Sequence, residues 1–380
     1  MYGLKKNSIT KLKNGVDWLL VIFILPILGF GLVTMSSFTK ETPFFFHQLI
    51  WIVISFAVFF AFSFIDFSFL KKTKILVLIF SIFAGLLLLL FIIGHISNGA
   101  KSWFSLGFLS FQPSDPMKLV VILLLAKYFS RRHVEIDNVK HIFVSALYAL
   151  IPFLLVFLQP DFGSAIIILS IWFGMVLISG ISWKNLLAVF GIGIAAFAFL
   201  WVFVFAPYQK ARIVNFIDPL SNIKTSGYSV YQSTIAVGSG EVFGKGVGFG
   251  TQSRLKFLPE YQTDFIFAAF VEEWGFAGAV ILFILVGLII WRILHIALLG
   301  ASNFEMLYGA GLSILIMSHF LINVGMNIGL MPVTGITLPF MSYGGSHLLT
   351  EFMGLGILMG MNKYRRVAHK DDMRNEFLGI

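Results

Sequence analysis

The sequence lacks cysteine altogether and is poor in charge, since only 12% of its 380 residues are Asp, Glu, Lys or Arg. The absence of cysteine excludes a disulfide framework and a thiolate metal site. In place of charge the chain carries hydrophobic surface: 58% of its residues are hydrophobic, and the mean hydropathy is +0.92. No water-soluble fold of this length is so apolar. Composition therefore predicts a polytopic membrane protein.

Further absences narrow the class of function. The eight histidines form no H-E-x-x-H motif and no i, i+4 pair, so they do not indicate a metal site. The two halves of the chain show no fixed-period repeat and no matching pair of broken helices, which argues mildly against an alternating-access transporter. The net charge of +9 comes from short basic clusters beside apolar runs, which is typical of membrane topology rather than of nucleic-acid binding.

Ten apolar runs are long enough to be membrane-spanning helices, and residues 1–380 are expected to form a single transmembrane domain. The runs fall near residues 17–38, 44–65, 75–94, 116–130, 141–158, 164–180, 185–205, 265–292, 303–327 and 346–362. The basic N-terminal stretch leads into an apolar run that is too long for a signal peptide and lacks an A-x-A-like cleavage site. The first run is therefore expected to be retained.

The basic residues predict the orientation of the chain. Lys and Arg gather near 5–13, 71–74, 131–140 and 363–374, which the alternation of the runs places on one side. Because such clusters stay in the cytoplasm, both termini are expected there, and the long loop 206–264 is expected outside. The predicted fold class is thus an all-α polytopic membrane protein with about ten transmembrane helices, a long extracytoplasmic loop and re-entrant outer-face segments.

A carboxylate stands where the stretch LPEYQTDFIF (258–267) becomes apolar. Asp264 can cap the helix that follows, or it can do chemistry at the mouth of a membrane span. On a regular helix, Glu272 would lie on nearly the same face and about 12 Å deeper, while Glu273 would point to the opposite side. Two carboxylates on one stripe of a membrane helix favour a polar cavity behind this helix.

A lysine near the start of a helix is the second unusual feature. In FQPSDPMKL (111–119), Ser114 or Asp115 can cap a helix with Pro116 at its first position, which leaves Lys118 in the first turn. The helix dipole disfavours a cation there, so the arrangement favours a bound anion, and phosphate is the typical case. The alternative is a local Asp115–Lys118 ion pair at i, i+3.

The remaining unusual polar features fall on the same expected outer side. Asp161 precedes a span, and the glycine-rich stretch 238–253 either permits close approach to a ligand or is merely flexible. The Pro- and Gly-punctuated stretch 332–349 is expected to be non-helical at membrane depth. His319 and His347 are interpreted as packing or cavity residues. This distribution predicts a site at the outer leaflet, with an anionic lipid-linked substrate as one candidate.

Several long motifs follow one another along the chain. They are QPSDPMK, QPDFGS, YQKAR, GKGVGFGTQSRLKFLPEYQTDFIFAAFVEEWG and GLMPVTGITLPFMSYGGS. In these motifs and in their order, the sequence resembles the SEDS family of bacterial membrane proteins, which includes RodA and FtsW, over nearly the whole chain. The pairing of GTQS with FLPE and the MPVTGI loop resemble RodA, the elongation member, more than FtsW, the division member.

This resemblance implies a peptidoglycan glycosyltransferase that polymerises lipid II outside the bacterial cytoplasmic (inner) membrane during cell elongation. Asp264 corresponds to the family's essential aspartate and is the expected general base. Lys118 is expected to stabilise the leaving pyrophosphate, with assistance from Arg212 or another cation of the long loop. The expected substrate-binding residues are Lys118, Asp115, Asp161, Arg212, Glu272, Ser342 and Gly344.

The resemblance also implies partners. A class B penicillin-binding protein that crosslinks the glycan, other elongation-complex proteins and membrane lipids are expected, and nucleic acid is not. No cofactor is required by the motifs, and a divalent cation, Mg²⁺ or Mn²⁺, at the pyrophosphate is left open. Two alternatives from other classes are a lipid II flippase and a non-catalytic scaffold for cell-wall synthases. An outer-face acid together with a basic helix N-terminus favours the transferase.

Three positions depart from the family pattern. Asp115 stands where glutamate is usual, so any contact made by its carboxylate must be re-spaced. Ser102 stands where an arginine is common, with the neighbouring Lys101 as a substitute charge that points differently. His347 stands where a serine is frequent, which puts any role of that hydroxyl in doubt.

Overall fold

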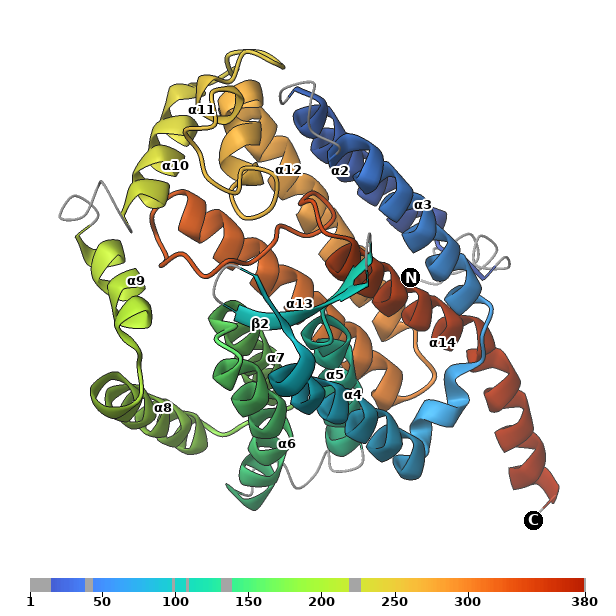
Figure 1. The fold of residues 1–380 in the computed structure, drawn as a ribbon. Helices are drawn as coiled ribbons and strands as arrows, with labels where there is room; N and C mark the ends of the chain where they lie inside the picture. The colour runs from blue at the N-terminus through green and yellow to red at the C-terminus, as the bar shows by residue number, and fades with distance from the viewer. Residues whose placement is uncertain are drawn as a thin grey trace.

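The computed structural model is a bundle of long helices (Figure 1). It describes residues 15–37, 44–97, 100–106, 109–130, 139–218 and 227–378. Each of the ten predicted apolar runs coincides with one long helix. These helices are α2 (Trp18–Ser37), α3 (Phe44–Ser63), α4 (Thr73–Ile93), α5 (Ser114–Ser130), α6 (Val139–Leu158), α7 (Phe162–Ile178), α8 (Trp183–Phe203), α12 (Ile266–Leu298), α13 (Asn303–Asn327) and α14 (Gly345–Leu378), and the short η2 (Phe67–Lys71) joins α3 to α4.

The helices form where the apolar runs lie because a chain in hydrocarbon must satisfy its own backbone hydrogen bonds. In the described part of the chain, seven helices are long enough and apolar enough to cross a membrane. Of the other three, α5 and α7 have 17 residues each, and α14 has 34 residues and ends in a charged segment. The predicted all-α polytopic membrane fold is confirmed.

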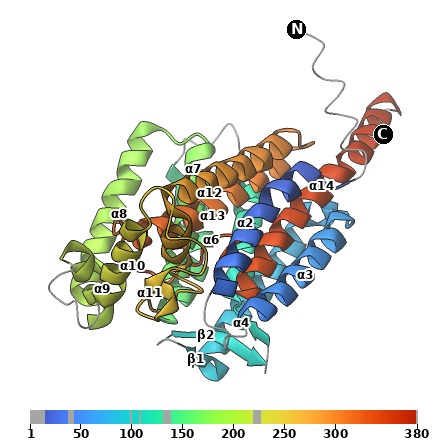
Figure 2. The same cartoon turned by 90° about the horizontal axis from the view of Figure 1, so that it is seen from above.

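A small antiparallel sheet was not predicted. It consists of β1 (His95–Ser97), β2 (Ala100–Leu106) and β3 (Leu109–Phe111) in the order β1-β2-β3. Figure 2 shows it at the edge of the bundle, beside α4. β1 and β3 have three residues each, too few for a periodic pattern, and β2 (AKSWFSL) shows no strict alternation of apolar and polar residues, which is why the sheet was not predicted. It carries Ser102, which is buried, whereas the side chain of Lys101 lies outside the described atoms.

The core of the bundle surrounds α13, which is buried along most of its length against α5, α7, α12 and α14. Small residues allow this close packing, because a Cβ at Gly309 would collide with Ala297 of α12 and one at Gly311 with Ile122 of α5. By contrast, α8 has no buried residue and lies apart from the core (Figure 1).

A fold-back in α12 determines where the candidate site lies. Gly275 has φ 69° and ψ −168°, which is not helical. The ring centroids of Phe267 and Phe283 lie 6.2 Å apart, although the same stretch of straight helix would hold them about 24 Å apart. Residues 266–274, which we call α12a, therefore lie against residues 276–298, which we call α12b.

The fold-back corrects the prediction of one continuous span over 265–292. α12b alone is about 34 Å long, which is enough for one crossing. The glycine-rich stretch 238–253 caps both halves at the turn, since it accepts from the first N–H groups of α12b and donates to the last carbonyls of α12a. The hydrogen bonds are Phe276 N to Glu241 O (2.9 Å), Ala277 N to Val242 O (3.0 Å), Lys245 N to Glu272 O (3.0 Å) and Gly246 N to Glu273 O (3.0 Å). These bonds disfavour the interpretation of the stretch as merely flexible.

The predicted outer loop contains α9 (Pro207–Ile217), α10 (Tyr228–Ser239) and α11 (Thr251–Arg254). At the same end of the bundle, residues 328–344 connect α13 to α14 without helix or strand (Figure 1). Ile336, Leu338 and Phe340 of this connection are nevertheless buried. Non-helical backbone was predicted here, and burial in protein is the condition under which a membrane protein tolerates it.

Candidate active site

Asp264 lies at the foot of α12a, recessed below the tip of the fold-back. Its Oδ2 atom is 3.5 Å from the position that a Cβ on Gly335 would take. Its backbone oxygen accepts hydrogen bonds from the side-chain amides of Asn323 (2.9 Å) and Asn327 (3.0 Å) on α13. The N-cap position of α12 is Phe265, and no side chain caps the helix. The interpretation of Asp264 as a helix cap is therefore not supported, and its position is fixed through its backbone.

Enclosure and neighbouring charges set the acidity of Asp264. The side chain is partly enclosed, and loss of hydration is the main cause that raises the pKa of Asp264 to about 7. The negative charge of Glu260 also raises this pKa, Arg212 lowers it, and Asp161 raises it weakly. The charges of Arg212 and Asp161 therefore lie within electrostatic range of Asp264. A carboxyl group with a pKa near 7 is suited to accept a proton at neutral pH.

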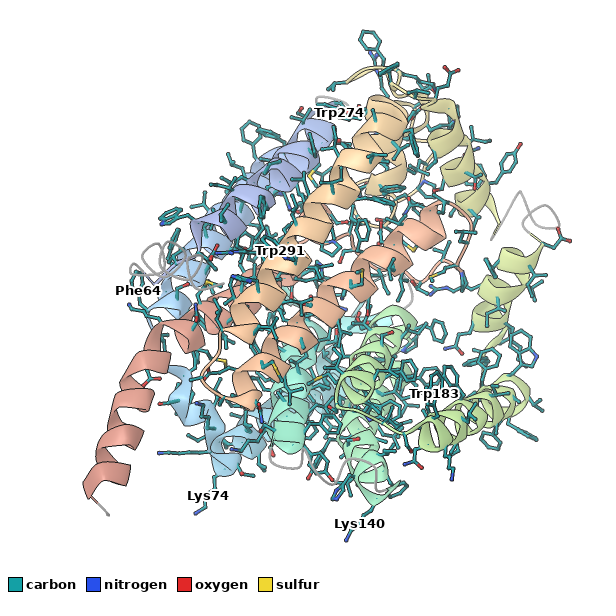
Figure 3. All side chains as sticks on the ribbon, turned by 180° about the vertical axis from the view of Figure 1, so that it is seen from behind. Phe64, Lys74, Lys140, Trp183, Trp274 and Trp291 are labelled. Carbon is teal, nitrogen blue, oxygen red and sulfur yellow. The ribbon has the colours of Figure 1, made fainter. Side chains whose placement is uncertain are left out.

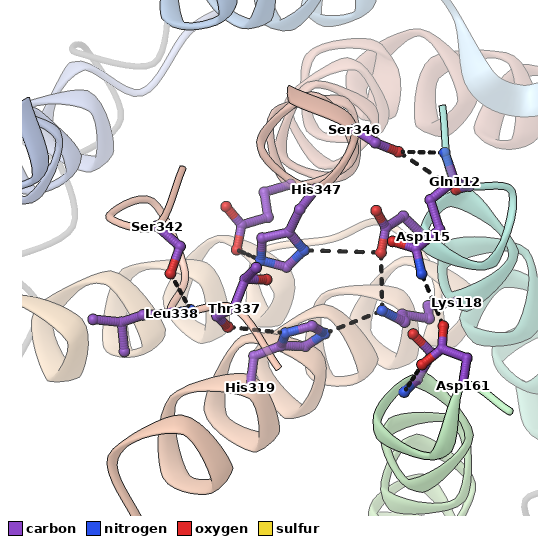
Figure 4. A network of polar contacts seen from close by, with 12 residues as sticks. Gln112, Asp115, Lys118, Asp161, His319, Thr337, Leu338, Ser342, Ser346 and His347 are labelled. Atoms are coloured by element: carbon purple, nitrogen blue, oxygen red, sulfur yellow. Dashed lines mark hydrogen bonds and ion pairs between the residues drawn. The ribbon is translucent and has the colours of Figure 1, made fainter. Parts of the chain in front are cut away.

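Lys118 lies in a buried network of ionisable side chains (Figure 4). Its ammonium nitrogen is 3.0 Å from Asp115 Oδ1, so the predicted local ion pair is present. The same nitrogen is 3.4 Å from His319 Nε2. His347 stacks on His319 with ring centroids 4.5 Å apart, and its Nε2 lies 3.0 Å from Glu351 Oε1. The network joins α5, α13 and α14 at the end of the bundle that holds Asp264.

Asp161 ties the starts of three helices together. Its Oδ1 atom accepts from Ser164 N (3.0 Å) and so caps α7, while its Oδ2 atom accepts from the Gln112 side-chain amide (2.8 Å) just before α5. Gln112 N in turn donates to the Ser346 hydroxyl (3.1 Å) in the first turn of α14 (Figure 4). The positive ends of three helix dipoles therefore converge near Lys118, which favours an anion there.

Glu272 faces the glycine-rich stretch and not a cavity shared with Asp264. Its Oε1 atom accepts from Lys245 Nζ (2.8 Å), Thr251 N (2.8 Å) and Gln252 N (3.2 Å). Glu273, predicted to point the opposite way, binds the same stretch through Gly248 N. The prediction that Glu272 lies deeper in the membrane than Asp264 is wrong, because α12a runs from Asp264 toward the tip of the fold-back and not into the bundle. A substrate contact by Glu272 stays a prediction, and its hydrogen bonds give it a supporting role.

Ser342 and Gly344 hold the non-helical connection in place. The Ser342 hydroxyl donates to Thr263 O (2.6 Å) and accepts from Leu338 N (2.7 Å). Gly344 N donates to the Gln48 side-chain oxygen (3.3 Å) on α3. Ser342 thus braces the residue directly before Asp264. The predicted contact of both residues with substrate stays a prediction.

Two asparagines that hold Asp264 were not predicted from the sequence. Asn323 and Asn327 are both fully buried in α13. The available signal was two amides at i, i+4 inside an apolar run, since a polar group in a membrane helix needs a specific partner. That partner, a backbone oxygen outside the run, cannot be identified without the fold.

The described residues include no cluster of three or more His, Cys, Asp or Glu side chains that could hold a metal ion. The site therefore consists of a recessed carboxyl group, a buried lysine–carboxylate pair and converging helix N-termini. This combination can remove a proton at one point and bind an anion at another. The fold and the site together define a membrane protein with many spans whose candidate catalytic side chains lie at one end of the bundle.

Comparison with known proteins identifies the family. Residues 16–367 match the FtsW/RodA/SpoVE family, described as cell cycle proteins, so the chain belongs to that family. The predicted resemblance to the SEDS family is confirmed.

Several curated relatives are similar over much of the chain. Stage V sporulation protein E of Bacillus subtilis is 35% identical over 94% of this chain and 100% of its own length. Peptidoglycan glycosyltransferase MrdB of Escherichia coli is 40% identical over 73% of this chain and 75% of its own. Probable peptidoglycan glycosyltransferase FtsW of Haemophilus influenzae is 34% identical over 92% and 90%.

Solved structures share the fold. A chain from a study of how a peptidoglycan synthase complex coordinates polymerisation and crosslinking superposes with a TM-score of 0.79 at 29% identity, covering 92% of this chain and 98% of the other. The rod shape determining protein RodA of Thermus thermophilus gives a TM-score of 0.69 at 29% identity, with 92% and 97% covered. The arrangement of helices described above is thus that of RodA-like proteins.

Proposed function

We propose that this protein is a peptidoglycan glycosyltransferase that polymerises lipid II at the outer face of the bacterial cytoplasmic membrane during elongation. The observation that carries the proposal is the recessed Asp264 carboxyl group, whose pKa is raised to about 7, at the end of the bundle where Lys118 lies buried. The names of the similar MrdB and FtsW proteins support the same activity.

The reaction follows from this division of roles. Asp264 takes the proton of the acceptor sugar hydroxyl as that oxygen forms a bond to the anomeric carbon of the donor. The bond from the anomeric carbon to the lipid pyrophosphate breaks, and the pyrophosphate leaves with the electron pair. Lys118 and the convergent helix N-termini stabilise the leaving charge, with Arg212 assisting near Asp264. A single displacement of this kind inverts the anomeric centre.

A divalent cation fits this scheme only as an ion carried by the substrate. Mg²⁺ or Mn²⁺ is typically held by pyrophosphate oxygens and one or two carboxylates. Because no three ligating side chains gather among the described residues, we assign such an ion to the pyrophosphate itself.

Both termini are proposed to lie in the cytoplasm and the site outside. Lys74 and Lys140 lie at the end of the bundle opposite Trp274 (Figure 3), and basic residues mark the cytoplasmic side. The proposed partner is a class B penicillin-binding protein that crosslinks the glycan, together with other elongation-complex proteins. The likeness to a chain of a peptidoglycan synthase complex supports an assembly of this type.

The decisive experiment is polymerisation of labelled lipid II by the purified protein with its transpeptidase partner. Wild type should make glycan, whereas Asp264→Asn, a nearly isosteric change that removes the base, should lose it. Asp66→Asn is the matched control, because Asp66 is an exposed carboxylate that caps η2 and asparagine caps equally well.

The alternatives give different outcomes. A wild-type complex that forms no polymer yet moves lipid II across liposomes would establish the flippase, and one that does neither would favour the scaffold. Equal polymer from wild type and Asp264→Asn would keep the enzyme but remove Asp264 as its base.

A further inference from the structure

A buried polar stripe runs along α13. His319, Asn323 and Asn327 follow one another at intervals of four residues, so they lie on one face of the helix, about 6 Å apart per step. Each is almost completely buried, with at most 3% of its surface exposed. Polar side chains are costly inside a membrane helix unless they serve a purpose.

His319 holds the ammonium group of Lys118. A lysine has only donors, so at 3.4 Å from Lys118 Nζ the Nε2 atom of His319 must accept. The proton of the neutral ring then resides on Nδ1, which donates to Thr337 O at 3.3 Å. The tautomer of His319 is therefore fixed from both sides, and it fixes Lys118 relative to the non-helical connection.

The two asparagines hold the segment that carries Asp264. The Asn323 amide donates to Asp264 O (2.9 Å) and to Ile336 O (2.6 Å). The Asn327 amide donates to the same Asp264 oxygen (3.0 Å), and its own oxygen accepts from Ala268 N (3.2 Å) in the first turn of α12a. The backbone before and after the start of α12a is thus attached to one turn of α13.

We infer that His319, Asn323 and Asn327 are positioning residues that set the distance between the Asp264 carboxylate and the Lys118 ammonium. Both groups are attached to the same face of α13. His319 holds the Lys118 ammonium group, and Asn323 and Asn327 hold the backbone of Asp264. The kinetic consequences of this inference rest on the proposed function. The claim that the three residues fix the positions of Asp264 and Lys118 does not.

The structural content is tested by amide hydrogen exchange. Asn323→Leu and Asn327→Leu are close in size to asparagine and remove the donors, so exchange in a peptide covering 262–269 should rise at least tenfold. Tyr308→Phe is the matched control, because it removes another buried hydrogen bond of α13, to Gly354 O (2.9 Å) on α14, far from Asp264. Unchanged exchange in both asparagine variants, or an equal rise in the control, would overturn the inference whether or not the protein polymerises lipid II.

Kinetics test the function of the stripe. In the asparagine variants kcat should fall at least tenfold with KM within about threefold, and the acid limb of the pH profile should move as Asp264 shifts. His319→Phe should instead raise KM for the lipid-linked donor at least fivefold. His319→Gln retains a donor and an acceptor, so its KM should return most of the way to the wild-type value. Equal losses in all three positions with no change in pH profile would show a merely structural role. If the wild-type protein makes no polymer, the proposed function is refuted, and the hydrogen-exchange result alone decides whether these three residues position Asp264 and Lys118.

Discussion

At the scale of single residues, the raised pKa of Asp264 makes the reaction sensitive to pH. A base must be deprotonated, so activity requires the fraction of Asp264 that has lost its proton. With a pKa of about 7, kcat/KM should fall about tenfold for each unit of pH below 7 and level off above it. Polymerisation rates between pH 5.5 and 8.5 measure this. A flat profile down to pH 5.5 would mean that Asp264 is fully ionised and is not the titrating base.

The Lys118–Asp115 pair has a structural contribution that can be separated from its proposed chemistry. Both side chains are buried, with 3% and 4% of their surface exposed. Lys118→Met should therefore leave the buried Asp115 carboxylate with only His347 beside it, whose Nδ1 lies 4.0 Å from Asp115 Oδ1, and destabilise the protein by about 3–5 kcal/mol. Adding Asp115→Leu removes that charge and should recover most of the stability, as read by the melting temperature in detergent.

Activity distinguishes the two roles of this pair. If Lys118 binds the pyrophosphate, the double variant Lys118→Met with Asp115→Leu should be stable and inactive. A stable double variant with wild-type activity would reduce the pair to a local salt bridge, which was the alternative from the sequence. The i, i+3 spacing sufficed to predict the pair itself. The contact with His319 was not predictable, because it joins helices that are far apart in the sequence.

At the scale of secondary-structure elements, the fold-back depends on one glycine. Gly275 has positive φ, and a Cβ there would collide with the backbone of Gly244. Gly275→Ala should therefore strain the turn by roughly 1–3 kcal/mol or more, lower the melting temperature and reduce polymerisation. Gly287→Ala, where a Cβ meets nothing within 4 Å, is the matched control and should be neutral or slightly stabilising. Equal melting temperatures for the two variants would contradict the account of the turn.

The same glycine shows how far sequence prediction reaches. Apolar runs predict helices in a membrane protein because the backbone has no other partner, and all ten runs are helical. The stretch FVEEWGFAGAV (270–280) reads as continuous helix, since one glycine in such a run does not state its φ. The hydrogen bonds that hold the turn come from 238–253, and they can be found only once the chain is folded. The position of Asp264 relative to the span was therefore predicted incorrectly, and its role as the base stays a prediction.

At the scale of the whole molecule, the proposed function requires the site to face outward. The chain contains no cysteine, so one introduced cysteine is a unique label. Arg254 and Lys140 are both exposed. Arg254 belongs to α11, which lies at one end of the bundle (Figure 1), and Lys140 lies at the other end (Figure 3). In intact spheroplasts, a membrane-impermeant thiol reagent should modify Arg254→Cys at once and Lys140→Cys only after permeabilisation.

This labelling experiment bears on every step of the mechanism. Lipid II is used outside the membrane, so an inward-facing Arg254 would place Asp264, Lys118 and the three convergent helix starts on the side where no glycan is made. Labelling of Lys140→Cys in intact spheroplasts, with Arg254→Cys protected, would therefore show the opposite topology and contradict the proposed transferase function. The expected pattern would leave only the chemistry to be decided, because a flippase and a transferase both open toward the outer leaflet and differ in whether a glycosidic bond forms there.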